Sequence, residues 1–79
     1  MLEVTGWIET ENGAECFEFT GRDMRVIAKA MIEVFDEDAG ETDMEATDQD
    51  GLDVTERLCS SIYKLQRVIK SYNNNEGLV

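Results

Sequence analysis

The first part of the chain alternates between apolar and polar side chains in two runs within residues 2–20. Such alternation places every second side chain on the same face of a β-strand. Asn12-Gly13 lies between the runs and is the strongest short signal for a type I′ hairpin turn. A two-residue loop there predicts that Ile8 lies opposite Phe17. We therefore expect an antiparallel hairpin over 2–20 whose core face carries Val4, Ile8, Phe17 and Phe19. The other face would carry Glu3, Trp7, Glu9, Glu11, Cys16 and Glu18.

Two later stretches repeat apolar residues every three or four positions, which is the spacing of one face of an α-helix. The first covers residues 21–36 and begins with a capping pair, Thr20 and Asp23. Its apolar arc is wide enough to contact both a sheet and another helix. The second covers residues 54–72 and follows the capping residue Asp53. The two patterns predict antiparallel helices that complete the core with Met24, Ile27, Met31, Phe35, Leu58, Ile62, Leu65 and Ile69.

Between the two helices both periodicities disappear. Residues 36–53 hold nine of the 18 acidic residues of the chain and no basic residue. We expect an acidic loop over 37–53, and a loop of this length in a small domain is more often functional or disordered than neutral. The acids that follow the first helix oppose its macrodipole, so they do not serve to stabilise it. Residues 73–79 are expected to form a tail.

The order hairpin, helix, loop and helix predicts one small α+β domain of the ββαα type. With 79 residues the core is small, and domains of this size often gain stability from a partner or from self-association. No apolar run is long enough to span a membrane, and the first residues lack the pattern of a secretory signal. We therefore expect a cytoplasmic protein in which Cys16 and Cys59 are reduced thiols.

The composition argues against catalysis. The chain has no histidine, which removes the commonest general base and the commonest metal ligand. It also has no glycine-rich phosphate loop and no nucleophile elbow. Neither cysteine has a histidine that could activate it, and two cysteines alone cannot complete a zinc site. We expect no catalytic residue, no metal site and no cofactor.

A short acidic run over residues 48–53 resembles part of a calcium-binding loop. Placing Gly51 at the sixth position of an EF-hand loop puts Ala46 at the first position and Arg57 at the twelfth, and both lack the required carboxylate. Gly40 at the sixth position fails in the same way. Weak cation binding by the acidic loop stays an alternative, which a shift of thermal stability in millimolar calcium would reveal.

Charge supplies the main indication of function. The net charge is −11 and the isoelectric point is about 4.1, while all seven bases lie within the two predicted helices. Direct binding of nucleic acid is disfavoured because such binding depends on neutralising phosphates. The basic side of helix 54–72, with Tyr63, is interpreted as a solvated face. Clustered acids instead suit a basic protein surface, such as one that holds DNA or RNA, and Trp7 could anchor the contact. The candidate partner-binding residues are Glu3, Trp7, Glu9, Glu11, Glu18, Asp36, Glu37, Asp38, Glu41, Asp43, Glu45, Asp48 and Asp50.

In its size, its charge and its acid-rich hairpin and loop, the chain resembles small phage-encoded inhibitors of host defence, which include anti-CRISPR proteins and DNA mimics. The resemblance implies a stoichiometric inhibitor that occludes the nucleic-acid-binding surface of a partner complex. Two other functions stay open. A small adaptor or antitoxin-like partner would bind through the apolar face of helix 21–36 with an affinity insensitive to salt. A self-associating subunit would show the mass of a dimer in solution.

Overall fold

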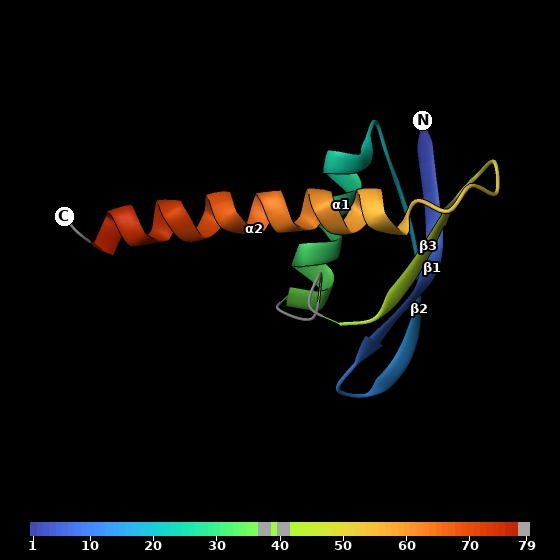
Figure 1. The fold of residues 1–79 in the computed structure, drawn as a ribbon, viewed down its shortest axis with the longest axis horizontal. Helices are drawn as coiled ribbons and strands as arrows, with labels where there is room; N and C mark the ends of the chain where they lie inside the picture. Colours follow the sequence, from blue (N-terminus) through green and yellow to red (C-terminus); the bar gives the residue numbers. More distant parts are fainter. Residues whose placement is uncertain (37–38, 40–41, 78–79) are drawn as a thin grey trace.

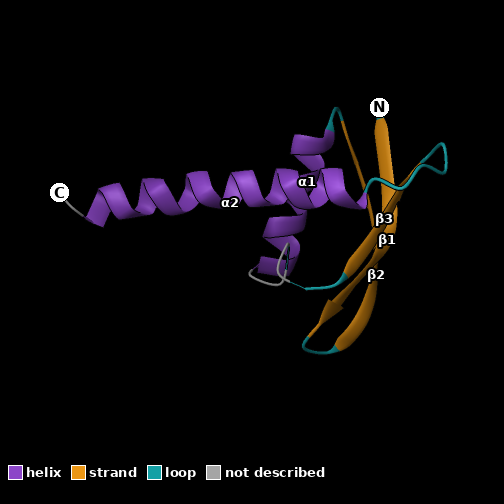
Figure 2. Cartoon of the chain, viewed as in Figure 1, coloured by secondary structure: helices purple, strands orange, loops and turns teal. Residues whose placement is uncertain are grey.

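The chain folds into two layers, a three-stranded antiparallel sheet and two helices that pack on one of its faces (Figures 1 and 2). The computed structural model describes all residues except 37–38, 40–41 and 78–79, and in 70–77 it describes the backbone alone. The predicted α+β class is confirmed, but a third strand lies between the two helices. The elements in chain order are β1 (Leu2–Thr10), β2 (Gly13–Gly21), α1 (Met24–Phe35), β3 (Met44–Asp48) and α2 (Thr55–Gly77).

β1 and β2 form the predicted hairpin in a register that differs by two residues. Ile8 lies opposite Glu15 rather than Phe17, because the turn residues are 11–12 and Gly13 follows them with a φ of 105°. A type I′ turn at 12–13 would need a positive φ at both positions, and here only the glycine has one. A shift of two residues leaves every side chain on its face. The predicted core face is therefore confirmed, with Val4, Ile8 and Phe17 buried and Phe19 half-buried.

The segment predicted to be a loop contains β3, which pairs with β1 and gives the strand order β2-β1-β3. Within β3, Met44 and Ala46 lie on the core face, whereas Glu45 and Thr47 lie on the outer face opposite residues of β1. The prediction was wrong here because the strand has only five residues and lies in an acidic stretch. Its period-two alternation becomes stable only through pairing with a distant strand.

β1 and β3 approach each other closely at Gly6, which lies opposite Ala46. A Cβ atom built on Gly6 would overlap the carbonyl oxygen of Glu45. Any side chain at this position would therefore have to displace β3 from the sheet. Glycine is required at position 6 by the proximity of another backbone.

The other edge of β3 is closed by the residues that lead into α2. The Ala46 N–H donates to Oγ1 of Thr55 (2.9 Å), and the Ala46 carbonyl accepts from the Val54 N–H (2.9 Å). The Asp48 N–H donates to the Leu52 carbonyl (3.0 Å). These hydrogen bonds satisfy an edge that would otherwise be open and attach the start of α2 to the sheet.

Both helices begin later than predicted, and α2 also continues further. α1 begins at Met24 because β2 continues to Gly21, and Oδ1 of Asp23 accepts a hydrogen bond from the Val26 N–H (3.1 Å) as its N-cap. α2 continues to Gly77, so most of the predicted tail is helical. The two helices cross in Figure 1 rather than lying antiparallel. In the part of the chain that the structure describes, neither helix is long and apolar enough to cross a membrane.

The core lies between the sheet and the two helices. Of the predicted core residues, Phe19, Phe35 and Leu65 are half-buried at its margin. Ile69 is 48% exposed, because α2 projects beyond α1 and the sheet (Figure 1). Several small residues were missed because they fill gaps between larger side chains. The buried apolar residues are Val4, Ile8, Phe17, Met24, Ile27, Ala28, Met31, Ala39, Ala46, Val54, Leu58 and Ile62.

Gly6→Ala is expected to lower the free energy of unfolding by about 2 to 3 kcal/mol, because the new methyl group competes with the backbone of β3. Thr5→Ala, at the neighbouring exposed position of the same strand, is the control and should cost less than about 1 kcal/mol. Urea unfolding of both variants measures the difference. Equal stabilities of the two variants would contradict the close approach of β1 and β3.

The Asp53 side chain at the start of α2 should make the free energy of unfolding depend on pH. The hydroxyl and then the backbone N–H of Thr55 hold the pKa of the Asp53 carboxyl below its ordinary value of 3.8. A lowered pKa in the folded state stabilises the fold above the ordinary value, and this contribution is lost as pH falls through the lowered value. Asp53→Asn should therefore differ most from the wild type at neutral pH and least in acid, as measured by urea midpoints. Parallel pH profiles would contradict this role of Asp53.

Candidate functional site

The outer face of the sheet is open and acidic. Among the described residues, both helices lie on the opposite side of the sheet, so the outer face is not covered by them (Figure 2). Acidic side chains reach this face from all three strands and surround one tryptophan. We call this surface the acidic sheet face and define it by Glu3, Trp7, Glu9, Glu18 and Glu45.

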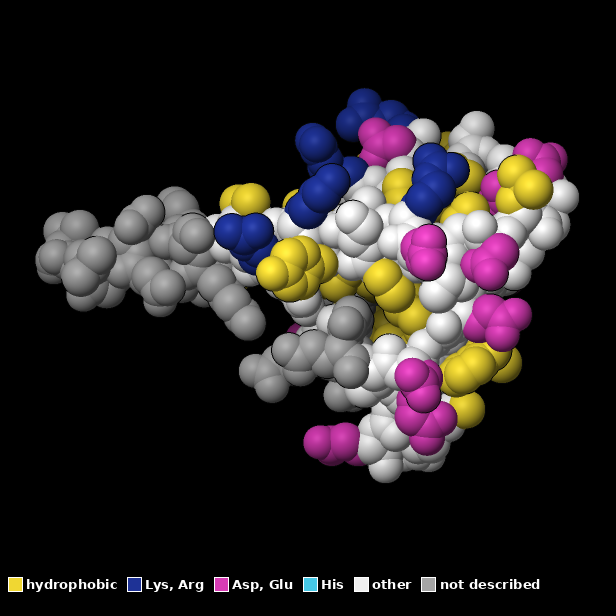
Figure 3. Space-filling view, in the orientation of Figure 1, with side chains coloured by type: hydrophobic (Ala, Val, Ile, Leu, Met, Phe, Trp, Pro, Cys, Tyr) yellow, Lys and Arg dark blue, Asp and Glu magenta, His cyan; other side chains and the backbone are white. Residues whose placement is uncertain are grey.

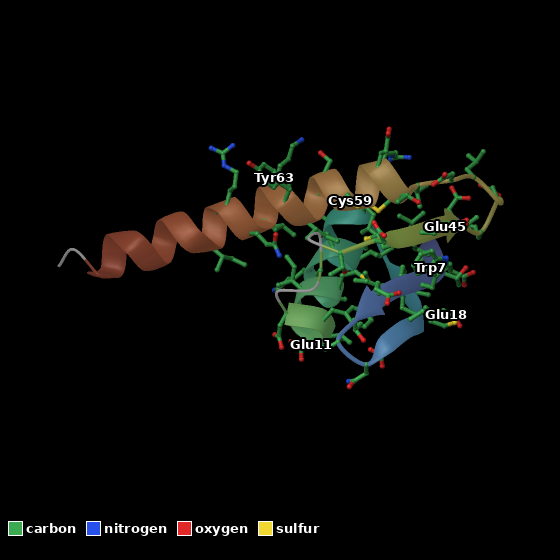
Figure 4. The ribbon with its side chains drawn as sticks, turned by 60° about the horizontal axis from the view of Figure 1, so that its bottom comes forward. Trp7, Glu11, Glu18, Glu45, Cys59 and Tyr63 are labelled. Carbon is green, nitrogen blue, oxygen red and sulfur yellow. The ribbon has the colours of Figure 1, made fainter. Side chains whose placement is uncertain are left out.

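Trp7 lies at the centre of the acidic sheet face. It belongs to the central strand, directly between Cys16 on β2 and Glu45 on β3. Side chains opposite each other on neighbouring strands are about 5 Å apart at Cβ, so these three residues are in contact range. Figure 4 shows Trp7 between Glu45 and Glu18 on this side of the sheet. The Trp7 side chain is 37% exposed, so one surface of the indole is available to a partner.

Charge is divided between the two layers of the molecule. None of the three strands contains a lysine or an arginine. All seven basic residues of the chain lie in the two helices or just before α1. Figure 3 shows lysine and arginine side chains over the helices and acidic side chains along the sheet. The acidic sheet face therefore has no cation of its own strands to neutralise it.

Two further predicted residues lie at the end of the acidic sheet face that contains the hairpin turn. Glu11 is in the turn itself and is exposed (Figure 4). Asp43 is placed beside β1, because the Glu9 N–H donates to the Asp43 carbonyl (2.9 Å). Both extend the negative charge of the face toward the turn. The structure thus brings together the hairpin acids and the acids next to and within β3.

The remaining predicted residues are not part of this face. Asp36 ends α1 with a φ of 50°, a left-handed conformation that is strained for a residue with a side chain. Asp48 is the last residue of β3, opposite Val4, and Asp50 lies in the connection to α2. Glu37, Asp38 and Glu41 lie outside the described residues. The predicted site is therefore divided between the sheet and separate loops.

The calcium-like run has a structural role in the loop between β3 and α2. Oδ1 of Asp48 accepts hydrogen bonds from the N–H groups of Asp50 (2.9 Å) and Leu52 (3.0 Å). Gly51 has a φ of 82°, which suits a glycine in a tight turn. Within the described part of the chain, no three acidic or thiol side chains converge as a metal site would require.

Sequence reasoning identified the candidate residue Glu45 but not its position beside Trp7. The signal that could have placed it is the alternation of Met44, Glu45, Ala46 and Thr47. This pattern is too short to predict a strand by itself. It does so only in combination with Gly6 of β1, which allows a neighbouring backbone to approach closely.

The two free thiols should differ in reactivity. Cys16 is exposed on the outer side of the sheet, whereas Cys59 is half-buried on α2, where burial raises the pKa of its thiol. We expect uncharged iodoacetamide to alkylate Cys16 at least about tenfold faster, because Cys16 is exposed, whereas burial restricts access to Cys59 and lowers its thiolate fraction. Mass spectrometry of Cys16→Ser and Cys59→Ser measures each rate separately. Faster reaction at Cys59 would contradict the exposure of the acidic sheet face.

Comparisons with protein-family models, with curated proteins and with solved structures find no match to this chain.

Proposed function

We propose that the protein is a non-catalytic inhibitor that acts in the cytoplasm. It binds the basic surface with which a partner complex holds nucleic acid, and it does so through the acidic sheet face. One observation carries the proposal: carboxylates from three strands lie around an exposed tryptophan on a sheet face whose strands contain no lysine or arginine. This anti-CRISPR-like or DNA-mimic-like role needs neither cofactor nor metal.

A sheet is well suited to present a regular array of negative charges. Neighbouring strands are about 4.8 Å apart, and alternate residues of one strand are about 6.7 Å apart. The carboxylates are thus held at fixed separations by a hydrogen-bonded backbone, and little backbone entropy is lost when a partner binds. Lysine and arginine side chains that normally contact phosphates could pair with them instead. Such an association would be rapid and would weaken as salt increases.

Trp7 adds apolar packing to the ionic contacts of the acidic sheet face. Tryptophan is enriched among the residues that dominate binding energy, particularly at the centre of an interface. Here the indole lies on the central strand, with acids on both neighbouring strands. It can pack against the aliphatic part of a lysine or stack on an arginine of the partner. The surrounding carboxylates would then determine orientation, and the indole would contribute affinity.

The adaptor alternative is less well supported. It requires an available apolar face on α1, but four apolar residues of this helix are already buried against the sheet and α2: Met24, Ile27, Ala28 and Met31. The exposed apolar side chains that remain on α1 are Val26 and Val34. With the half-buried Ala30 between them they form one narrow stripe of small side chains along the helix.

Neutralising the acidic sheet face should abolish inhibition without changing the fold. The test variant is Glu9→Gln/Glu18→Gln/Glu45→Gln. Its control, Glu15→Gln/Glu33→Gln/Glu56→Gln, removes the same charge from exposed acids outside that face. We expect the test variant to recover at least about tenfold less partner from nuclease-treated lysate at low salt, and the control to bind like the wild type.

The recovered partner should release a labelled oligonucleotide when wild-type protein is added, and Trp7→Ala should weaken that release.

The control variant distinguishes binding by the acidic sheet face from a general attraction of basic partners to a negatively charged protein. Equal loss of binding in both triple variants would mean that net charge alone drives association. Undiminished binding by the test variant would exclude the acidic sheet face as the contact surface. Partner recovery that resists high salt would exclude an electrostatic mechanism. Circular dichroism of each variant establishes that the fold is retained.

A further inference from the structure

The helical layer contains a groove on the side of the molecule opposite the acidic sheet face. A hollow of about 450 Å³ lies between the start of α1 and the middle of α2, lined by Arg25, Ser61, Lys64, Leu65 and Val68. A second hollow of about 350 Å³ shares Ser61 and Lys64 with it and continues to Arg57. The two form one continuous depression along α2. We call it the helical groove and define it by Arg25, Arg57, Ser61, Lys64, Leu65 and Val68.

The helical groove combines an apolar part with a basic rim. Val68 is 66% exposed, and the exposed part of the half-buried Leu65 adds to its apolar surface. Three exposed cations, Arg25, Arg57 and Lys64, stand around this surface. In Figure 3 the basic side chains gather over the helices, away from the acids of the sheet. The chemistry of the groove is thus the reverse of that of the acidic sheet face.

The dimensions of the groove match a helix. From Arg57 to Val68 the α2 backbone rises by about 16 Å, which corresponds to three turns. Ser61 is small and lies where the two hollows meet, so a second helix can approach α2 there. We propose that the helical groove binds an acidic amphipathic helix of a partner protein. An apolar side chain of that helix would pack on Leu65 and Val68, and its flanking carboxylates would pair with the three cations.

A second copy of this chain is a poorer occupant. Over the groove, the charged residues that α2 presents are Arg57 and Lys64, with the single acid Glu56 at one end. A symmetric contact between two α2 helices would place cations against cations, which is destabilising. The acidic surface of a second copy is a sheet, which does not fit a depression the width of one helix.

Nucleic acid is also a poorer occupant. Phosphates would use the cations but would leave Leu65 and Val68 against a highly charged backbone. An amphipathic acidic helix satisfies both the apolar and the basic part of the groove. Because the groove and the acidic sheet face lie on opposite layers, both could be occupied at once, so this inference is independent of the proposed function.

The test uses the full chain labelled with ¹⁵N and a synthetic helical peptide of about 18 residues, which covers the groove with a turn or two to spare. The peptide carries leucines at helical spacing on one face and glutamates on both flanks. A control peptide replaces each glutamate with lysine. With the acidic peptide we expect saturable amide shifts at 56–68 and around Arg25 and unchanged signals in the strands. With the control peptide we expect no shifts at 56–68 or around Arg25.

Paired variants locate the contact. Lys64→Glu should weaken binding of the acidic peptide by at least about tenfold, because an attractive charge becomes repulsive. Arg67→Glu reverses a charge on the same helix outside the groove and should change affinity less than about threefold. Val68→Asp should abolish binding, whereas Val34→Asp, at a valine that is 59% exposed on α1, should not. These four positions are exposed, so the variants are expected to fold.

Three results would overturn the proposal. The first is the absence of saturable shifts up to about 1 mM acidic peptide. The second is an equal response of the groove residues to the acidic and basic peptides, which would show that the cations of the groove contribute nothing. The third is binding of a single-stranded oligonucleotide at the groove in preference to the acidic peptide, which would assign the cations to phosphates.

Discussion

The pairing of β3 with β1 is the contact on which the rest of the molecule depends. A two-stranded hairpin alone is marginally stable in water, and the third strand extends it into a sheet with a face large enough to pack two helices. The same strand holds the start of α2 through the hydrogen bonds between Ala46 and residues 54–55. It also places Glu45 beside Trp7 on the outer face of the sheet. All of this requires the absence of a side chain at Gly6, so a single backbone contact links stability, helix placement and the composition of the acidic sheet face.

The separation of charge follows from the two-layer architecture. A strand exposes alternate residues, so acids at every second position all reach the same side of the sheet. No described charged residue is buried, so charge can accumulate only on the two outer surfaces. The strands carry acids and no lysine or arginine, whereas all the bases lie on the helices or just before α1, and the apolar core lies between the two layers. The acids of the sheet are thereby separated from the bases of the helices, which leaves the acids available to a partner of the other sign.

Sequence reasoning succeeded where a structure is determined locally. Alternation predicted both faces of the hairpin, and helical spacing predicted both helices. It failed where the outcome depends on distant residues. β3 needs a partner strand with a glycine at the right position, and Ile69 is exposed because α2 is longer than the surface available to cover it. The hairpin register depended on the backbone conformation of Asn12, which its residue type alone does not decide. For the site, the alternation predicted that Trp7 and the hairpin acids share one face. Glu45 joins that face only because β3 pairs with β1. Asp36 lies instead at the end of α1, and the Asp48 side chain binds the loop after β3.

The uncovered acids have opposite consequences for folding and for binding. In the free protein, carboxylates at neighbouring positions repel one another, and this repulsion opposes the compact state. Salt screens the repulsion and should stabilise the fold, whereas it weakens attraction to a basic partner. Since the two effects of salt have opposite signs, loss of binding at high ionic strength cannot be attributed to unfolding. Lysines of a partner would remove the same repulsion more effectively than salt, because they are held next to the carboxylates. A partner that binds the folded state in this way must also stabilise it, so the repulsion that lowers the stability of the free protein is relieved in the complex.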